Sequence, residues 1–169
     1  DTAATICTGG SFTINPALIS GASIPAGTTY SWGAPIVTGG LTGGTSGTDP
    51  NTISGTLTNS TTATQTATYT VTPLSPIGTC AGAPFDIVVT VRPQLVVTPQ
   101  LSNFNGFEIS TAGGNDGWIN LSPAGGSGSY SYSWTGPNGF TSSAQNITGL
   151  TAGTYIATIS DGLCSNVVL

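Results

Sequence analysis

Charged side chains are almost missing from this sequence. They make up 4% of its 169 residues, with no His, one basic residue (Arg92) and six Asp or Glu. An average soluble protein has about 25% charged residues. Binding to nucleic acid needs basic groups that displace phosphate counterions, and binding to anionic membranes needs polybasic segments. The composition therefore argues against both kinds of partner.

Long apolar runs are also missing. No run approaches the roughly 20 residues that a membrane-spanning helix needs, so we expect no membrane insertion. Hydrophobic residues still make up 37% of the chain and the net charge is only −5, which argues against disorder. The chain starts at Asp1 and has no Met, so we expect a processed product or fragment whose parent continues on both sides.

The side chains that usually carry catalysis are scarce. Four acids are candidates for general acid–base chemistry: Asp86, Glu108, Asp116 and Asp161. Because the chain has no His, no Lys and one Arg, nothing is available to tune or assist them. No nucleophile-elbow, zinc-protease or phosphate-loop motif occurs. We therefore expect no enzymatic activity.

The patterning that is present favours short β-strands. Gly or Pro interrupts every window long enough for a helix. Apolar and polar residues alternate instead, and Thr, Val, Ile and aromatic residues fit such pleated surfaces. The clearest alternating segments are 11–15, 29–32, 66–72, 85–91, 130–134 and 155–159. Short strands separated by Gly, Pro and Asn clusters predict an all-β fold of the sandwich type.

The two halves of the chain repeat each other. Each half has an aromatic strand, a Gly turn, a Tyr strand and then a Cys. The matching segments are 30–32 with 132–134, 53–55 with 147–149, and 68–72 with 154–158. This order predicts two tandem immunoglobulin-like β-sandwich modules, 1–93 and 94–169, with Trp32 and Trp134 in the cores and Tyr69 and Tyr155 starting strands near corners. The linker at Pro93 is very short, so we expect a rod-like array.

Three cysteines are present. Cys7 and Cys80 fall in the first module, and a disulfide between them would stabilise it by roughly 4 kcal/mol. Two buried thiols are the alternative. Cys164 has no partner in its own module, so we expect it to be unpaired or bonded outside this sequence. No metal site is expected from the cysteines because the chain has no His and no CxxC pair.

Two further kinds of binding residue can be named. Asp116 and Asp161 each sit in a short acidic turn, and the pair could bind Ca²⁺ if the two turns meet; plain turn formation by Asn/Asp-Gly is the alternative. Trp118 and Phe140 are the aromatic candidates for contact with a sugar surface. Packing, including packing between modules, is the alternative for both.

The Gly-rich segments of the second half resemble a known repeat. They are 109–117, 125–134, 149–155 and 160–164. Together they resemble the SprB-type repeat of very large surface adhesins of gliding Bacteroidota, over about residues 95–169. Residues 6–93 resemble the PKD-like immunoglobulin-fold modules found beside that repeat. One position departs: similar repeats often have a Cys at Thr111 that would pair with a Cys like Cys164.

This resemblance implies a structural segment of a cell-surface adhesin filament. Such proteins leave the cell through the type IX secretion system, are moved by the gliding machinery, and grip external surfaces or polysaccharides. Asp1-Thr2-Ala3 also resembles the O-glycan acceptor of Bacteroidota, which makes Thr2 a candidate glycosylation site. The alternatives are a carbohydrate-binding accessory region of a secreted enzyme, and a component of a surface layer or fibre.

Overall fold

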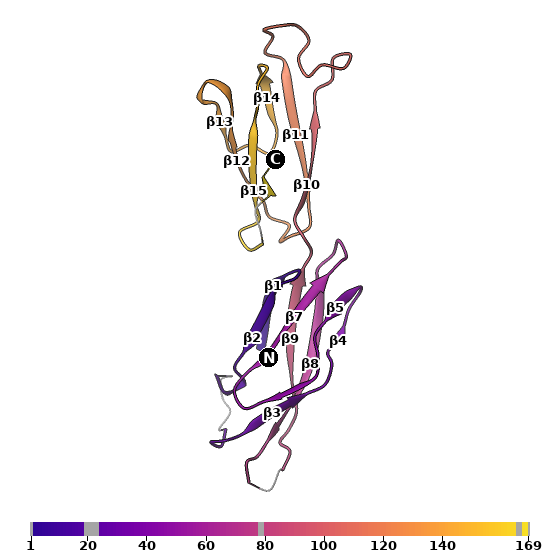
Figure 1. The fold of residues 1–169 in the computed structure, drawn as a ribbon, viewed down its shortest axis with the longest axis vertical. Coiled ribbons are helices and arrows are strands. Elements are labelled where there is room, and N and C mark those ends of the chain that lie inside the picture. Colours follow the sequence, from indigo (N-terminus) through magenta and orange to yellow (C-terminus); the bar gives the residue numbers. More distant parts are fainter. Residues whose placement is uncertain (1, 19–23, 78–79, 165–166, 169) are drawn as a thin grey trace. The chain divides into compact units, whose positions relative to one another are not determined.

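The computed structural model describes residues 2–18, 24–77, 80–164 and 167–168 (Figure 1). This part of the chain has β-strands and two single 3₁₀ turns, η1 (Pro16–Leu18) and η2 (Pro137–Gly139), and no α-helix. It divides into two compact units, Asp1–Gln94 and Leu95–Leu169. The sequence had predicted all-β architecture of the immunoglobulin type, and the structure has it.

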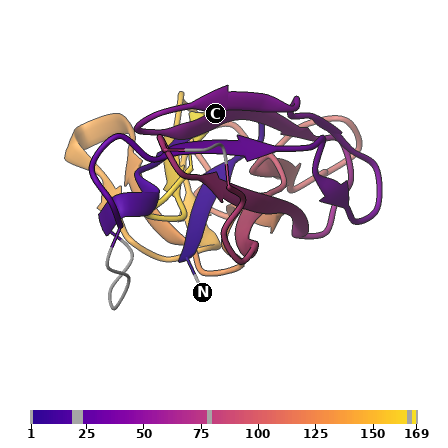
Figure 2. The ribbon, with the colours of Figure 1, turned by 90° about the horizontal axis from the view of Figure 1, so that it is seen from below.

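The first unit is a sandwich of two sheets, whose strands can be followed in Figures 1 and 2. The strands among its described residues are β1 (Thr2–Cys7), β2 (Ser11–Ile14), β3 (Thr29–Trp32), β4 (Ile36–Val37), β5 (Leu41–Gly43), β6 (Gly47–Asp49), β7 (Ile53–Asn59), β8 (Gln65–Leu74) and β9 (Phe85–Arg92). The larger sheet has the order β1-β9-β8-β3-β6, with β4 also paired to β8, and the smaller has the order β2-β7-β5. The strand β1 runs parallel to β9, whereas the other pairs are antiparallel.

The core of the first unit comes from alternate residues of these strands. In β8, Ala67, Tyr69 and Val71 are fully buried, and the Thr residues between them are not. Strand β9 repeats the pattern, and Ile53 and Leu57 of β7 face them from the other sheet. Each fully buried Ile, Leu or Val contributes about 1.5–3 kcal/mol through removal from water. This alternation fixes the register, because a one-residue slip would turn the apolar set outward.

The second unit is a smaller sandwich. Its strands are β10 (Val96–Leu101), β11 (Gly117–Ala124), β12 (Ser131–Thr135), β13 (Thr141–Ser142), β14 (Ile147–Leu150), β15 (Ile156–Ser160) and β16 (Val167–Val168). They form one sheet of order β10-β11-β14 and one of order β13-β12-β15-β16. The core includes Leu121 from the first sheet and Trp134, Ala157 and Ile159 from the second. Pro99 lies in β10, an edge strand, where a missing N–H costs no ladder hydrogen bond.

The two Trp residues at equivalent places in the repeat, Trp32 and Trp134, differ in burial. Trp134 is 2% exposed, as predicted for a core residue, and its Nε1 donates to the Ala144 carbonyl over 2.8 Å. Trp32 is only partly buried, so its prediction as a core-filling residue is wrong; Tyr30 takes that place at 2% exposure. Trp32 ends β3, and its ring lies so close to Gly47 of β6 that an added Cβ would be 2.6 Å from it.

The repeated Tyr residues differ as well. Tyr155 lies directly before β15 and its hydroxyl donates to the Thr151 carbonyl over 3.1 Å, the geometry of a tyrosine corner. Tyr69 lies inside β8 rather than at a corner, so that prediction is wrong for the first unit. Its ring packs on Phe12 with centroids 5.4 Å apart. Strand β8 begins at Gln65, before Tyr69, whereas β15 begins at Ile156, directly after Tyr155.

Removal of the Tyr69 hydroxyl gives the first testable prediction. This hydroxyl is buried and has no hydrogen-bond partner among the described residues, and burial raises its pKa above the ordinary value of 10.0. We expect Tyr69→Phe to raise the free energy of unfolding by about 1 kcal/mol, since an unsatisfied buried hydroxyl costs about 1–3 kcal/mol. Urea titration at pH 7 measures the change.

The same substitution has a pH signature. A raised folded-state pKa means that the folded chain holds its phenol proton more tightly, so stability is full below pH 10 and declines as the pH rises above it. Tyr69→Phe removes part of this alkaline decline. Tyr155→Phe, whose hydroxyl is hydrogen-bonded, is the matched control and should lower stability at pH 7. A Tyr69→Phe variant that is less stable than wild type at pH 7 contradicts the prediction.

Candidate functional site

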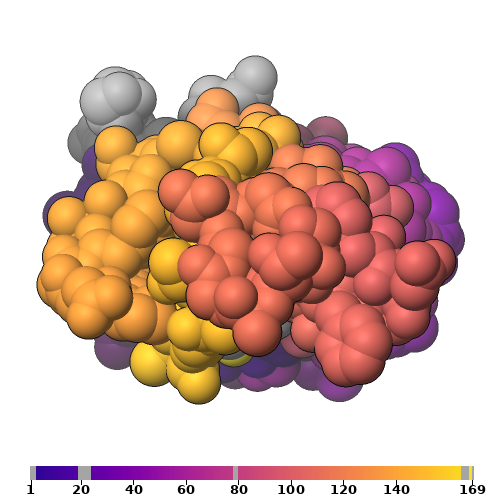
Figure 3. Space-filling model, turned by 90° about the horizontal axis from the view of Figure 1, so that it is seen from above, coloured from indigo at the N-terminus to yellow at the C-terminus, as the bar shows by residue number. Residues whose placement is uncertain are grey.

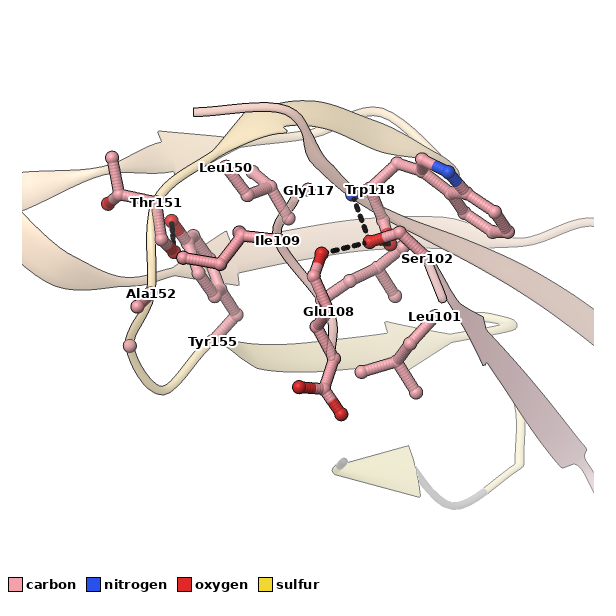
Figure 4. Close-up of a pocket in the computed structure, with 12 residues that line it drawn as sticks. Leu101, Ser102, Glu108, Ile109, Gly117, Trp118, Leu150, Thr151, Ala152 and Tyr155 are labelled. Atoms are coloured by element: carbon pink, nitrogen blue, oxygen red, sulfur yellow. Dashed lines mark hydrogen bonds between the residues drawn. The ribbon is translucent and has the colours of Figure 1, made fainter. Parts of the chain in front are cut away.

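The second unit holds a cavity of about 290 Å³ at one end of its sandwich (Figure 4). The long segment 102–116 between β10 and β11 forms one wall, and the β14–β15 connection forms the other. Most of the lining is apolar. The lining residues are Leu101, Ser102, Glu108, Ile109, Gly117, Trp118, Ile119, Leu150, Thr151, Ala152, Gly153 and Tyr155.

Hydrogen bonds hold the segment 102–116 in place. Ser102 is 3% exposed; its hydroxyl donates to the Glu108 carbonyl over 2.6 Å and accepts the backbone N–H of Trp118 over 2.9 Å. Figure 4 shows Ser102 between these two partners. Loops longer than about 12 residues are uncommon and are often functional. The sequence analysis missed Ser102, because a single Ser in a Ser-rich chain carries no signal.

A tight turn shapes the tip of the segment. Phe104 and Phe107 exchange backbone hydrogen bonds of 2.7 and 3.3 Å around Asn105-Gly106. Both turn residues have positive φ, 56° and 96°, which Asn and Gly tolerate best. The Asn103 side chain accepts the Gly106 N–H over 2.8 Å. This turn presents the Phe107 side chain at 69% exposure. Figure 3 looks onto the second unit, with this part of the chain in salmon.

The two predicted calcium-binding acids do not meet. Asp116 directly precedes β11, whereas Asp161 accepts the Ser127 N–H just beyond the other end of that strand. Eight extended residues at about 3.3 Å each separate the two sites by roughly 25 Å. The prediction of a joint site is therefore wrong. Among the described residues, no three Asp, Glu or Cys side chains gather closely enough to hold a metal ion.

Each acid has a local structural role instead. The Asp116 carboxylate accepts hydrogen bonds from the Ser110 side chain and from the Ser110 backbone N–H, and these lower its pKa below the ordinary 3.8. Asp161 is 9% exposed and accepts three backbone N–H groups: Ser127 at 2.8 Å, Leu163 at 3.0 Å and Cys164 at 2.6 Å. It ties the end of β15 to the turn after β11. Both acids follow the alternative given for them, turn formation.

The other two acids that were candidates for catalysis lie in different units. Asp86 lies on β9 of the first unit and accepts the Thr70 hydroxyl over 2.8 Å. Glu108 lies in the segment 102–116 of the second unit and is exposed. The absence of enzymatic activity stays a prediction.

The predicted aromatic contact residues do not form a joint platform. Phe140 is partly buried and packs edge-on against Tyr155, with centroids 5.3 Å apart and planes at 82°. Trp118 is half-buried in β11 and belongs to the other sheet, where it lines the cavity. Phe140 thus follows the packing alternative, while Trp118 keeps a partly open face.

The cysteines differ from the prediction. Among the described residues, Cys7 is disulfide-bonded and so is Cys164, whereas Cys80 is exposed and is not disulfide-bonded. The predicted bond between Cys7 and Cys80 is therefore wrong, and so is the prediction of an unpaired thiol at Cys164.

The predicted glycosylation site is only partly described. Thr2 is the first residue of β1, but its side chain lies outside the described part of the structure, as does Asp1. O-glycosylation at Thr2 stays a prediction. In the described part of the chain, we find no helix with the length and apolar character needed to span a membrane.

The strand order and the two separate cores define an immunoglobulin-type β-sandwich protein. The chain belongs to the PKD-like domain family, whose model matches residues 4–95, just over half of the sequence. No curated protein matches it.

One solved structure similar to the chain is a C-terminal 282-residue fragment of intimin, crystallised with the intimin-binding domain of the translocated intimin receptor. The two are 18% identical with a TM-score of 0.48, and the alignment covers 100% of this chain and 60% of the fragment. At this level the likeness carries no argument about function.

Proposed function

We propose that the chain is a structural segment of a large cell-surface adhesin filament used in surface attachment. The observation that carries the proposal is the pair of sandwiches, one of them a PKD-like domain, with separate cores and acids spread over both. A disulfide supports a location outside the cytoplasm, because disulfides persist in oxidising compartments. The modules act as spacers, and attachment to surfaces or polysaccharides uses the whole filament.

We further propose that the parent protein acts in gliding motility and is exported by the type IX secretion system. The resemblance of residues 95–169 to SprB-type repeats supports gliding motility as the process and the type IX system as the export route. The machinery would act on other parts of the parent protein, because this chain consists of sandwich modules alone in its described part. Neighbouring modules of the same parent chain are the direct partners.

The second candidate is a carbohydrate-binding accessory region of a secreted enzyme. The position of Phe140 speaks against it, because this ring is partly buried against the core and Tyr155 and has less open surface for a sugar. Immunogold labelling of intact cells that make the protein separates the candidates. We expect label on thin filaments at the cell surface. Cells without surface label, together with recovery of these residues in a secreted enzyme from the culture medium, would overturn the proposal in favour of the accessory region.

A further inference from the structure

The cavity of the second unit lies next to exposed apolar side chains. Leu101, which lines it, is 50% exposed, and Phe107, next in the chain to the lining residue Glu108, is 69% exposed. Exposed apolar side chains that gather at a groove are typical of interaction sites. Burial of such surface yields about 25 cal/mol per Å². A partner that covers the exposed apolar side chains at this end of the sandwich would therefore gain binding free energy.

The walls of the cavity are ordered before any partner arrives. Ser102 fixes the Glu108 and Trp118 backbones, and the Asn105-Gly106 turn fixes the tip that presents Phe107. Asp116 holds the far end of the segment through the Ser110 N–H at 3.1 Å. Binding therefore costs little conformational entropy in this wall of the cavity, and the affinity for a given contact area is higher for that reason.

The charge of the cavity selects the chemistry of the partner. Of the lining residues that the structure describes, Glu108 alone is charged at neutral pH, and its carboxylate points away from Ser102 in Figure 4. The second unit has no Lys, Arg or His in its sequence, so no side chain of its own can neutralise Glu108. A second copy of the chain is equally poor in cations. A partner that brings a positive charge gains a complementary contact here that neither this unit nor a second copy supplies.

We propose that this cavity binds a peptide segment of another protein in which an apolar side chain lies next to Lys or Arg. The apolar side chain enters among Leu101, Ile109 and Ile119, and the cation lies against the Glu108 carboxylate. A neutral sugar fits less well, because apolar walls leave its hydroxyl groups without hydrogen bonds. An anionic glycan is repelled by Glu108. This site is independent of a spacer role.

NMR titration of the intact chain tests the proposal, with acetyl-Phe-Lys-amide as the probe and acetyl-Phe-Glu-amide as its charge-reversed control. We expect the Lys peptide to shift the amide signals of Ile109 and Trp118 at millimolar concentration, and the Glu peptide to bind more weakly. Glu108→Gln should reduce the affinity for the Lys peptide two- to five-fold, which corresponds to about 0.5–1 kcal/mol for an exposed ion pair.

Two controls make the outcome decisive. Asp86→Asn removes an exposed carboxylate from the first unit and should leave Lys-peptide binding unchanged. Ile109→Ser removes an apolar wall and should weaken binding of both peptides. Equal affinity for the two peptides, signal shifts away from the cavity, or no shifts at all would overturn the proposal, as would tighter binding of methyl glucoside than of the Lys peptide.

Discussion

Trp134→Ala is expected to lower the free energy of unfolding of the second unit by about 3–5 kcal/mol, the usual cost of deleting a buried aromatic side chain. Trp134 is 2% exposed, sits between the two sheets, and loses its hydrogen bond to Ala144 on substitution. Domains of this size have only about 5–15 kcal/mol of stability in total. Hydrogen exchange measured by mass spectrometry on β12 and β15 peptides should therefore show a large loss of protection.

The matched control is Trp118→Ala. Trp118 is the same residue type in the same unit, but it is half-buried at a cavity wall, so its loss should cost less than half as much. Equal losses for the two variants would contradict the assignment of Trp134 as the central core residue. The comparison also cancels any general effect of removing an indole.

Asp161→Ala is the second large effect, with an expected loss of about 3 kcal/mol. The carboxylate accepts the backbone N–H groups of Ser127, Leu163 and Cys164, and hydrogen bonds to a charged group contribute about 1.5–3 kcal/mol each before relaxation. Ala leaves these donors without their acceptor where the residue was 9% exposed. Urea denaturation followed by far-UV circular dichroism measures the loss.

Asp161→Asn is the informative partner of that variant. Its remaining carbonyl oxygen can still accept from Leu163 and Cys164, while the amide NH₂ that replaces the other oxygen faces the Ser127 N–H. We expect an intermediate loss of stability. If Asp161→Asn is as stable as wild type, the bond to Ser127 contributes nothing, and the role assigned to this carboxylate is wrong.

The all-β fold could be predicted because alternation is a local signal. Segments such as 66–72 and 85–91 carry apolar faces that appear in the structure as buried faces of β8 and β9. Strand β1 could not be predicted in the same way. Its segment Thr2–Cys7 lacks a clean alternating face, and its pairing with β9 is parallel and spans most of the unit.

Other features depend on contacts that no local pattern encodes. Trp32 and Trp134 occupy equivalent places in the repeat, yet only Trp134 enters the core, because Trp32 ends β3 beside Gly47. The cavity could not be predicted either, since its two walls, the segment 102–116 and the β14–β15 connection, are distant in the sequence. The joint calcium site predicted from Asp116 and Asp161 was wrong because the two acidic turns lie at opposite ends of β11, which the sequence pattern does not reveal.

The most direct test of the proposed role is the contour length of surface filaments in electron micrographs, with immunogold against these residues identifying the filaments that contain them. It compares cells that make the natural protein with cells whose gene lacks the codons for these 169 residues in frame. A spacer made of two sandwich modules predicts label in the first strain only, and filaments in the second that are shorter by two modules. Filaments of unchanged length that never carried label would contradict the proposal.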